Sequence, residues 1–286
     1  MAVKVKIKKE KKEGIYDLKG RLDVKDPGFD ESVKKLTPEK IEKAVNTVLN
    51  FRNTAMRFAA PLETCIHCAL CSNSCHWYIS HGKDPTYSPV AKVKMTIWKM
   101  IKRKGKVSPE FIKQAARIAF TECNLCRRCS MYCPFGFDIA YQLGMVRRIC
   151  FVLGVVPQNI LDQDNSLSAT LTQLWITQAD LIDTMQWQEE EVRAEIKNAR
   201  IPVDKEGADV MWCPLGTEPK VATYHIARIA KIMNVAGIDW TVSSVDGWDS
   251  ANMAMFIRDM ETMQRIVRGI FDNAMRLKVK RIVLTE

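Results

Sequence analysis

Cys65-Ile-His-Cys-Ala-Leu-Cys-Ser-Asn-Ser-Cys75 and Cys123-Asn-Leu-Cys-Arg-Arg-Cys-Ser-Met-Tyr-Cys133 are the two stretches of sequence that decide the fold. In both runs, two residues separate the first three cysteines and three residues precede the fourth. Pro134 follows the second run, whereas His76 follows the first. A run with this spacing supplies three thiolates to one iron–sulfur cubane, and its fourth cysteine ligates the neighbouring cubane when two runs are present.

The spacing therefore predicts two [4Fe–4S] clusters that exchange their fourth ligands. The first cluster is expected to be held by Cys65, Cys68, Cys71 and Cys133. The second is expected to be held by Cys123, Cys126, Cys129 and Cys75. This cross-ligation would tie both runs into one unit and keep the clusters close enough for electron transfer. No catalytic residue is assigned from the sequence.

Two other uses of the cysteines are less consistent with the pattern. Structural zinc takes two separated Cys-x-x-Cys pairs and leaves the middle cysteine of a triplet without a role. Disulfide frameworks are typical of short secreted chains, whereas this chain has 286 residues and no signal-peptide pattern. Iron–sulfur ligation is the interpretation that uses all eight cysteines of the two runs.

Composition and helix signals divide the chain into four predicted parts. Residues 1–36 are expected to be a basic tail, because Met1–Lys12 alone carries six lysines. Residues 37–157 are expected to be an α-helical ferredoxin domain. Its helices are predicted to start at Thr37-Pro38, Ser88-Pro89 and Ser108-Pro109, with the first continuing to Ala59 and another spanning Phe137–Leu153.

Residues 158–206 are expected to be an acidic helical connector, since residues 158–210 hold eleven acidic and four basic side chains. Glu189-Glu190-Glu191 is interpreted as a helix start within it. Residues 207–286 are expected to be the first part of an α/β domain. Strands at 208–213, 239–243 and 280–284 alternate there with helices at 219–235 and 250–278, which predicts a parallel sheet. A binding loop is expected after the last strand, so the chain is interpreted as truncated at Glu286.

Several other residues are candidates for lesser roles. His67 and His76 flank the predicted ligands and are interpreted as neighbours that tune the clusters. Arg127 and Arg128 could raise a cluster's potential, receive an acidic donor or simply face solvent. The remaining candidates are Cys150, Trp98, Trp175 and Trp187, interpreted as core or interface residues, and Cys213, interpreted either as a buried core residue or as a candidate at the carboxyl end of the first strand.

The formal net charge of +10 is concentrated in the N-terminal half. A solvated basic face, an acidic protein partner and anionic lipid all remain compatible with it. Nucleic acid is not expected as a partner, since no binding module is recognisable. No apolar stretch approaches the roughly 20 residues that a spanning helix needs, so no transmembrane segment is expected in this chain.

The chain resembles the heterodisulfide reductase family over about residues 40–286. The likeness rests on the two cysteine runs together with Ala236-Gly-Ile-Asp-Trp240, Gly247-Trp-Asp-Ser-Ala-Asn252 and Val283-Leu-Thr-Glu286. Within that family it is most similar to the DsrK type, the HdrD-like iron–sulfur subunit of the Dsr membrane complex of sulfur-metabolising prokaryotes. The resemblance implies a CCG-type α/β domain that binds a noncubane [4Fe–4S] cluster. Of its first repeat only Cys213 is present, and the second repeat would start after Glu286.

This resemblance implies an oxidoreductase subunit in dissimilatory sulfur metabolism, including sulfate reduction. Electrons from a membrane quinone-linked subunit of a Dsr-type complex would pass through both cubanes and reduce a disulfide or trisulfide. The substrate would be a heterodisulfide or a DsrC-type sulfur carrier protein. The subunit would lie at the cytoplasmic face of the membrane. Two alternatives stay open: an iron–sulfur subunit of a glycolate or lactate oxidase type complex, and a non-catalytic electron relay.

Overall fold

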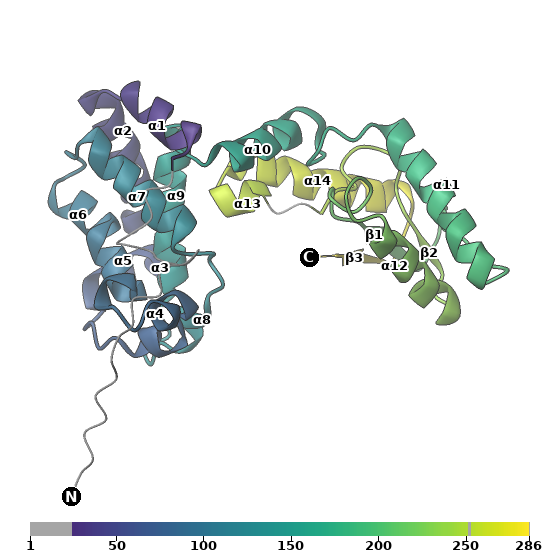
Figure 1. Ribbon diagram of the computed structural model, residues 1–286, viewed down its shortest axis with the longest axis horizontal. Helices are drawn as coiled ribbons and strands as arrows, with labels where there is room; N and C mark the ends of the chain where they lie inside the picture. The colour runs from purple at the N-terminus through teal and green to yellow at the C-terminus, as the bar shows by residue number, and fades with distance from the viewer. Residues whose placement is uncertain (1–24, 251–252, 286) are drawn as a thin grey trace, which may run out of the picture.

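The computed structural model describes residues 25–250 and 253–285. Figure 1 shows a bundle of helices formed by the N-terminal half and a second group of helices around a small sheet formed by the C-terminal half. The elements of the first half are α1 (Pro27–Lys34), α2 (Pro38–Leu49), η1 (Asn50–Asn53), α3 (Met56–Thr64), η2 (Leu70–Ser74), α4 (His76–Ser80), η3 (Pro85–Tyr87), α5 (Pro89–Met95), α6 (Ile97–Lys102), α7 (Pro109–Thr121), α8 (Arg128–Met131) and α9 (Ile139–Val152). Those of the second half are α10 (Gln158–Thr170), α11 (Gln178–Glu195), β1 (Val210–Cys213), α12 (Tyr224–Val235), β2 (Trp240–Thr241), α13 (Met253–Ile257), α14 (Met260–Arg276) and β3 (Arg281–Leu284).

The three predicted helix starts are confirmed, each with proline at the first helical position. The hydroxyl of Thr37 accepts a hydrogen bond from the Lys40 amide at 3.3 Å. The hydroxyls of Ser88 and Ser108 accept equivalent bonds, both at 3.2 Å. These caps satisfy amide groups that would otherwise lack partners at the ends of α2, α5 and α7. Short polar side chains before proline therefore set where α2, α5 and α7 begin.

The prediction of one helix from Pro38 to Ala59 is wrong. The Phe51 carbonyl accepts from both the Thr54 and Ala55 amides, so the chain tightens into η1 and leaves the path of α2. Apolar spacing continues through this turn, which is why periodicity alone did not show the break. α3 then begins after Ala55, whose backbone is extended, and ends directly before Cys65.

Part of the segment expected to be a basic tail is helical instead. Residues 1–24 lie outside the described residues, but Pro27–Lys34 forms helix α1 and Phe29 is buried. Asp26 caps α1, and its carboxylate also accepts from the Gln158 amide at 3.0 Å. Residues 25–36 are therefore packed against the helical bundle and the start of α10. A buried aromatic residue and a proline preceded by aspartate mark this short helix within the predicted tail.

The core of the first half is built around α7 and α9. Its fully buried members include Ile41 of α2, Ile112 of α7 and Val146 of α9. Phe29 and Phe120 also meet in this core, with ring centroids 6.5 Å apart. Because α7 and α9 immediately precede and follow the second cysteine run, this core fixes both ends of that run.

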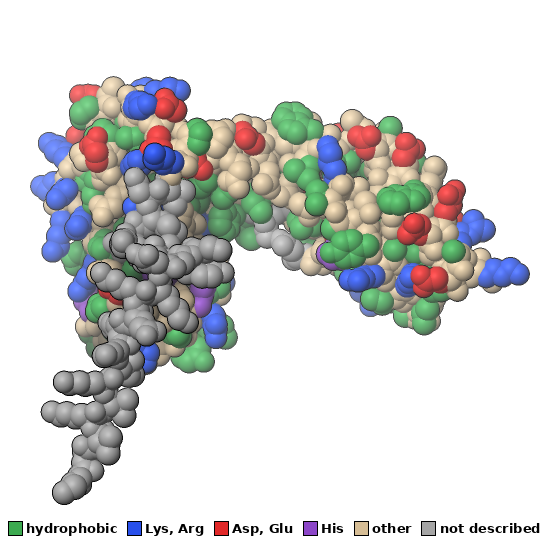
Figure 2. Space-filling model, in the orientation of Figure 1, with side chains coloured by type: hydrophobic (Ala, Val, Ile, Leu, Met, Phe, Trp, Pro, Cys, Tyr) green, Lys and Arg blue, Asp and Glu red, His purple; other side chains and the backbone are tan. Residues whose placement is uncertain are grey.

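The acidic segment after α9 contains two helices, but its acidic triplet is not a helix start. α11 begins at a capping box in which Thr177 and Asp180 bond each other's backbone amides. Glu189-Glu190-Glu191 lies in the later turns of that helix, and Glu189 accepts from the Ile201 amide at 2.7 Å. The prediction for the triplet is wrong because local capping, rather than the attraction of the helix dipole for acidic residues, decides where α11 begins. Figure 2 shows several Asp and Glu side chains over this part of the surface.

The predicted parallel sheet is confirmed, with strand order β2-β1-β3. Val210 of the central strand lies opposite Trp240 on one side and Arg281 on the other. The expected helix over 219–235 begins only at Tyr224, and the expected strand over 239–243 is reduced to Trp240–Thr241. The expected helix over 250–278 is divided into α13 and α14, because Arg258 takes a left-handed backbone with φ of 71° and Asp259 caps α14.

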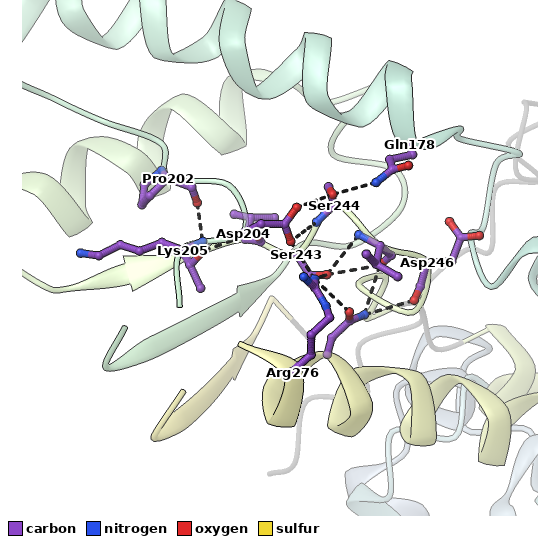
Figure 3. A network of polar contacts seen from close by, with 12 residues as sticks. Gln178, Pro202, Asp204, Lys205, Ser243, Ser244, Asp246 and Arg276 are labelled. Atoms are coloured by element: carbon purple, nitrogen blue, oxygen red, sulfur yellow. Dashed lines mark hydrogen bonds and ion pairs between the residues drawn. The ribbon is translucent and has the colours of Figure 1, made fainter. Parts of the chain in front are cut away.

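A polar network holds the chain after β2 against its neighbours (Figure 3). Arg276 of α14 donates to Asp204 at 2.7 Å and to the Ser243 hydroxyl at 2.9 Å. Gln178 of α11 donates to the Ser244 hydroxyl at 2.9 Å. Burial alone would raise the pKa of Asp204, but hydrogen bonds from Ser244 and Arg276 outweigh it and keep that pKa below its usual value. In the described ranges, no helix combines the length and apolar character needed to cross a bilayer.

Candidate iron–sulfur site

The two cysteine runs have matching backbones. His67 and Ala69 in the first run have φ values of 59° and 63°. Leu125 and Arg127, at the equivalent positions of the second run, have φ values of 57° and 61°. None of the four is glycine, so each carries a steric cost of roughly 1–2 kcal/mol that the surroundings must offset. Two loops of different sequence thus adopt the same strained turn, which turns successive cysteines toward one centre.

The exposure of the cysteines also repeats between the runs. Cys68 and Cys126, the second cysteines, are exposed, whereas Cys71 is buried and the remaining five are partly buried. All eight thiols are free of disulfides. No three His, Cys, Asp or Glu side chains in residues 25–250 and 253–285 are grouped as ligands of a single metal ion. A cubane, in contrast, holds four thiolates apart by the width of its own core.

Cys133 of the second run acts on Cys71 of the first run. Burial, with smaller contributions from the thiols of Cys65 and Cys133, raises the pKa of Cys71 to about 11. The hydroxyl of Ser74 donates to the Cys71 carbonyl at 3.1 Å and steadies the turn that follows. Cys133 is thus close enough to influence Cys71, one of the predicted ligands of the first cluster, and the exchange of fourth ligands stays a prediction.

The four predicted ligands of the second cluster, here called the second group, lie around a small cavity. The wall of this cavity includes Cys75, Cys123, Cys126 and Cys129. Burial raises the pKa of Cys129 to about 12, with further contributions from the thiols of Cys123 and Cys71. The Leu125 amide donates to the Cys123 sulfur at 3.4 Å. Cys75 of the first run thus lies with three cysteines of the second.

Trp77 and Lys92 contribute further polar groups to the wall of this cavity. The indole nitrogen of Trp77 is buried and has no hydrogen-bond partner in the described part of the chain. Lys92 is 1% exposed and donates from its ammonium group to the Glu122 carbonyl. A buried donor without a partner fits a site that receives an acceptor such as a cluster sulfide or thiolate.

Lys92 and Arg147 were missed from the sequence. Each lies on the apolar stripe of its helix. Lys92 lies one turn after Pro89 of α5 and one turn before Thr96, which follows α5. Arg147 lies one turn after Leu143 and one turn before Cys150 of α9. Arg147 is fully buried and donates to the Ala119, Cys123 and Phe256 carbonyls. A cation on an otherwise apolar stripe is the signal that could have identified both residues.

Asp138 supports the second run from the start of α9. Its carboxylate accepts from Arg57 Nε at 2.9 Å, Arg127 Nη2 at 3.0 Å and the Ser130 hydroxyl at 2.8 Å. It also caps α9 by accepting from the Tyr141 amide at 3.1 Å. Arg127 therefore has an ionic partner on the protein, and both Arg127 and Arg128 line the cavity of the second group.

The other candidates are placed as follows. His76 lines the cavity of the second group, and the ring of His67 packs edge-on against Trp98 with centroids 6.3 Å apart. Burial lowers the pKa of both histidines. Cys150 lies in the core as predicted. Trp175 and Trp187 are about half exposed and do not belong to the core.

Cys213 ends the central strand, as predicted, and is fully buried. Burial raises the pKa of its thiol to about 12, and Asp249 adds to the rise. At the same edge of the sheet, Thr285 accepts from the indole nitrogen of Trp212 at 3.1 Å and donates to Glu218 at 3.0 Å. Cys213 is the single cysteine of residues 207–286 and has no thiol partner.

Comparison with known proteins gives a match to one family and to two curated relatives. Residues 61–137 match the family described as a 4Fe-4S dicluster domain. The Hdr-like menaquinol oxidoreductase iron-sulfur subunit 2 of Archaeoglobus fulgidus is 26% identical, over 53% of this chain and 29% of that protein. The Hdr-like menaquinol oxidoreductase iron-sulfur subunit of Archaeoglobus profundus is 23% identical, over 79% of this chain and 43% of that protein. No solved structure matches the chain.

The chain spans less than half the length of either relative. The family match begins just before Cys65 and ends just after Cys133, so it contains both cysteine runs and the helices between them. Residues 61–137 thus match a 4Fe-4S dicluster domain, in a chain that is similar to iron–sulfur subunits of Hdr-like menaquinol oxidoreductases.

Proposed function

We propose that the chain binds two [4Fe–4S] clusters and passes electrons between them. The first cluster takes Cys65, Cys68, Cys71 and Cys133 as ligands, and the second takes Cys123, Cys126, Cys129 and Cys75. The observation that carries the proposal is that Cys75 of the first run lines the same cavity as Cys123, Cys126 and Cys129. The electrostatic effect of Cys133 on Cys71 supports the complementary exchange. When bound, each cluster supplies a one-electron carrier.

The residues around the runs hold this arrangement in place. Asp138 and Arg127 join the start of α9 to the second run, and Ser74 steadies the first. The exposed thiols of Cys68 and Cys126 would leave one side of each cluster near the surface, where an electron can enter or leave. Cys71 is buried and Cys129 is partly buried, which limits the access of water to these two thiols.

We infer further that this relay works in a membrane-associated, quinone-linked redox complex. Support comes from the two relatives, whose names describe iron–sulfur subunits of menaquinol oxidoreductases. The DsrK-type assignment, a position at the cytoplasmic face of the membrane and attachment through partner subunits rest on the sequence resemblance. In domain terms, residues 37–157 would form the cluster domain, 158–206 the connector and 207–286 the CCG-like part.

The final acceptor is proposed to be a disulfide or trisulfide, carried by a DsrC-type protein or a heterodisulfide. A noncubane [4Fe–4S] cluster at such a site needs several cysteines, and residues 207–286 supply only Cys213, which is buried. These residues do not fit that cluster, and no bond-breaking step is assigned to them. The same observation favours the second candidate function, an electron relay whose acceptor site is formed by other residues.

Metal analysis of anaerobically purified protein tests the cluster proposal. About eight iron atoms and eight acid-labile sulfides per chain are expected, with electron paramagnetic resonance signals of two interacting reduced cubanes. Cys126→Ser should remove or alter the second cluster, while Cys150→Ala, outside both runs, should leave the iron content unchanged. An iron content near four, or zinc in place of iron, would refute the two-cluster proposal.

Addition of a thiol to the oxidised protein tests the disulfide proposal separately. A new signal that forms only with thiol would support a disulfide-cleaving site on the protein used. Two unchanged cubane signals would leave the relay as the function of this protein.

A further inference from the structure

Lys92 is a buried cation that its helix does not explain. It lies on the inner face of α5 with Pro89 and Val93, where an apolar side chain is the norm, yet it is only 1% exposed. Ammonium groups are almost never buried in this way without compensating negative charge, because removing the charge from water is strongly unfavourable. The surroundings of the Nζ atom must therefore offset that cost.

Those surroundings belong to the second group of cysteines. Lys92 shares a cavity wall with Cys75, Cys123, Cys126 and Cys129. Its ammonium group donates to the Glu122 carbonyl, directly before Cys123, and lies 5.8 Å from the centre of the Trp77 ring. Burial lowers the pKa of Lys92, while the thiols of Cys75 and Cys123 oppose that effect. The side chain is thus directed at the place where the second cluster would add negative charge.

Among the described residues, Lys92 and Arg147 are the two basic side chains that are buried. Cys71, of the first group, is influenced by the thiols of Cys65 and Cys133, and both raise its pKa. Lys94, whose charge lowers the pKa of His67 in the first run, is exposed to solvent. Arg147, in contrast, donates to the Cys123 carbonyl of the second run and is fully buried. Buried charges act at short range with little screening, whereas exposed ones are weakened by water and salt.

We propose that Lys92 raises the reduction potential of the second cluster above that of the first, so that an electron shared by the pair resides on the second cluster. Reduction adds negative charge to a cluster, and a buried ammonium beside it stabilises the reduced form more than the oxidised form. The inference rests on the proposed ligation of two clusters. It adds a direction to the relay: from the cluster of Cys65, Cys68, Cys71 and Cys133 to the cluster beside α5.

A redox titration followed by electron paramagnetic resonance tests this assignment on the full chain. Cys68→Ser and Cys126→Ser identify which titration step belongs to which cluster, because each changes a ligand of one cluster only. Lys92→Met and Lys92→Gln should lower the potential of the second step. The expected change is at least tenfold in the ratio of reduced to oxidised second cluster at a fixed potential, which is about 59 mV for one electron. Lys92→Arg should keep the second step near its wild-type position.

Lys94→Met is the matched control, because it removes one positive charge from the same helix at an exposed position. It should move the second step much less than Lys92→Met does. If Lys92→Met and Lys92→Gln load both clusters but leave the second step unchanged, the inference is wrong while the two-cluster proposal stands. A wild-type protein with fewer than two clusters would instead refute the proposed function itself.

Loss of cluster loading is also informative. If the second cluster is lost in Lys92→Met and Lys92→Gln but kept in Lys92→Arg, the buried positive charge serves that cluster, as proposed. Loss in all three variants would show that only the shape of lysine matters and would overturn the inference. A wild-type titration in which the first cluster has the higher potential would overturn it as well.

Discussion

Asp138 is the residue on which the second cysteine run most depends for its attachment to the core. One carboxylate serves Arg57, Arg127 and Ser130 and also caps α9. Burial would raise the pKa of Asp138, but the bonds from Arg57 and Ser130 outweigh it, so the pKa lies below its usual value. This carboxylate therefore stabilises the fold at neutral pH, and its contribution is lost as the pH falls through the lowered pKa.

We predict that Asp138→Asn lowers the free energy of unfolding by about 1–3 kcal/mol, since two guanidinium groups lose their charged acceptor. Chemical denaturation at pH 7 measures the change. Asp183→Asn, at an exposed position of α11, is the control and should change stability by less than about 0.5 kcal/mol. Equal effects of the two substitutions would contradict the role given to Asp138.

Asp164 is a buried carboxyl group of α10 that lies against Asp259, at the start of α14. Burial raises its pKa to about 7, and the charge of Asp259 adds to the rise. The folded protein therefore binds a proton that the unfolded chain releases at much lower pH. Stability should fall as the pH rises from about 4 to about 7, because the unfolded state binds fewer protons over that range.

Asp164→Asn should remove this pH dependence, because the amide does not ionise. Relative to wild type, we predict that the variant gains roughly 2–4 kcal/mol of stability at pH 8 compared with pH 4. Denaturation curves at both pH values give the difference. Asp162→Asn, an exposed position on the same helix, should show no such gain. A flat wild-type profile between pH 4 and pH 7 would rule out the raised pKa.

At the scale of elements, two glycines allow the loop after β2 to touch α14. Gly247 has φ of 94°, and a Cβ atom on Gly269 would come within 2.9 Å of the Gly247 Cα atom. Gly269 lies within α14, where alanine is normally preferred by about 1 kcal/mol. The contact between the two backbones therefore opposes the intrinsic preference of the helix.

We predict that Gly269→Ala destabilises the protein by about 1–3 kcal/mol, despite the higher helix propensity of alanine, because the loop must move away from α14. Thermal unfolding measures the effect. Arg268→Ala, at the exposed neighbouring position, controls for propensity and should be nearly neutral. Stabilisation by Gly269→Ala would show that the loop yields without cost.

The helix starts show which elements can be read from sequence. Thr37, Ser88 and Ser108 before proline predicted α2, α5 and α7, because capping is a local property. The breaks at η1 and at Arg258 were not predicted, since the apolar spacing runs through both. The break at η1 follows from local hydrogen bonds to the Phe51 carbonyl, whereas Arg258 lies against a distant helix, where a Cβ atom on Gly144 would meet its guanidinium at 2.7 Å.

At the scale of the whole molecule, Arg147 connects the two halves seen in Figure 1. It extends from α9, donates to the Phe256 carbonyl of α13 at 2.9 Å, and stacks on the Phe256 ring at 3.7 Å. The same guanidinium donates to the Cys123 carbonyl at the start of the second run. Burial lowers its pKa to about 10, so it stays charged at neutral pH.

We predict that Arg147→Met weakens the contact between the halves and costs roughly 2–5 kcal/mol, since three carbonyl groups lose a charged donor. Hydrogen exchange should show faster exchange in α13, with smaller changes in α7. Arg148→Met, its half-buried neighbour over Phe51, should leave α13 unchanged. Unaltered exchange in α13 of Arg147→Met would mean that other contacts hold the halves together.

The cysteine pattern predicted the two groups of thiols because ligand spacing is a local property of the sequence. Lys92 and Arg147 could not be located in the same way, because their environment is made by residues 24 to 109 positions away. Helical periodicity places a cation on the solvent side by default. Their positions on apolar stripes mark both residues as unusual, and the packing of α5, α7 and α9 shows that they are enclosed.

The matched left-handed residues at 67 and 69 and at 125 and 127 have a consequence for protein engineering. Two loops with the same backbone conformation should be interchangeable. If residues 65–75 and 123–133 were exchanged, each cysteine sulfur should occupy the position of its counterpart in the other loop. Any difference between the two sites that depends on α5 and α9 would then keep its original position, because these helices are not exchanged with the loops.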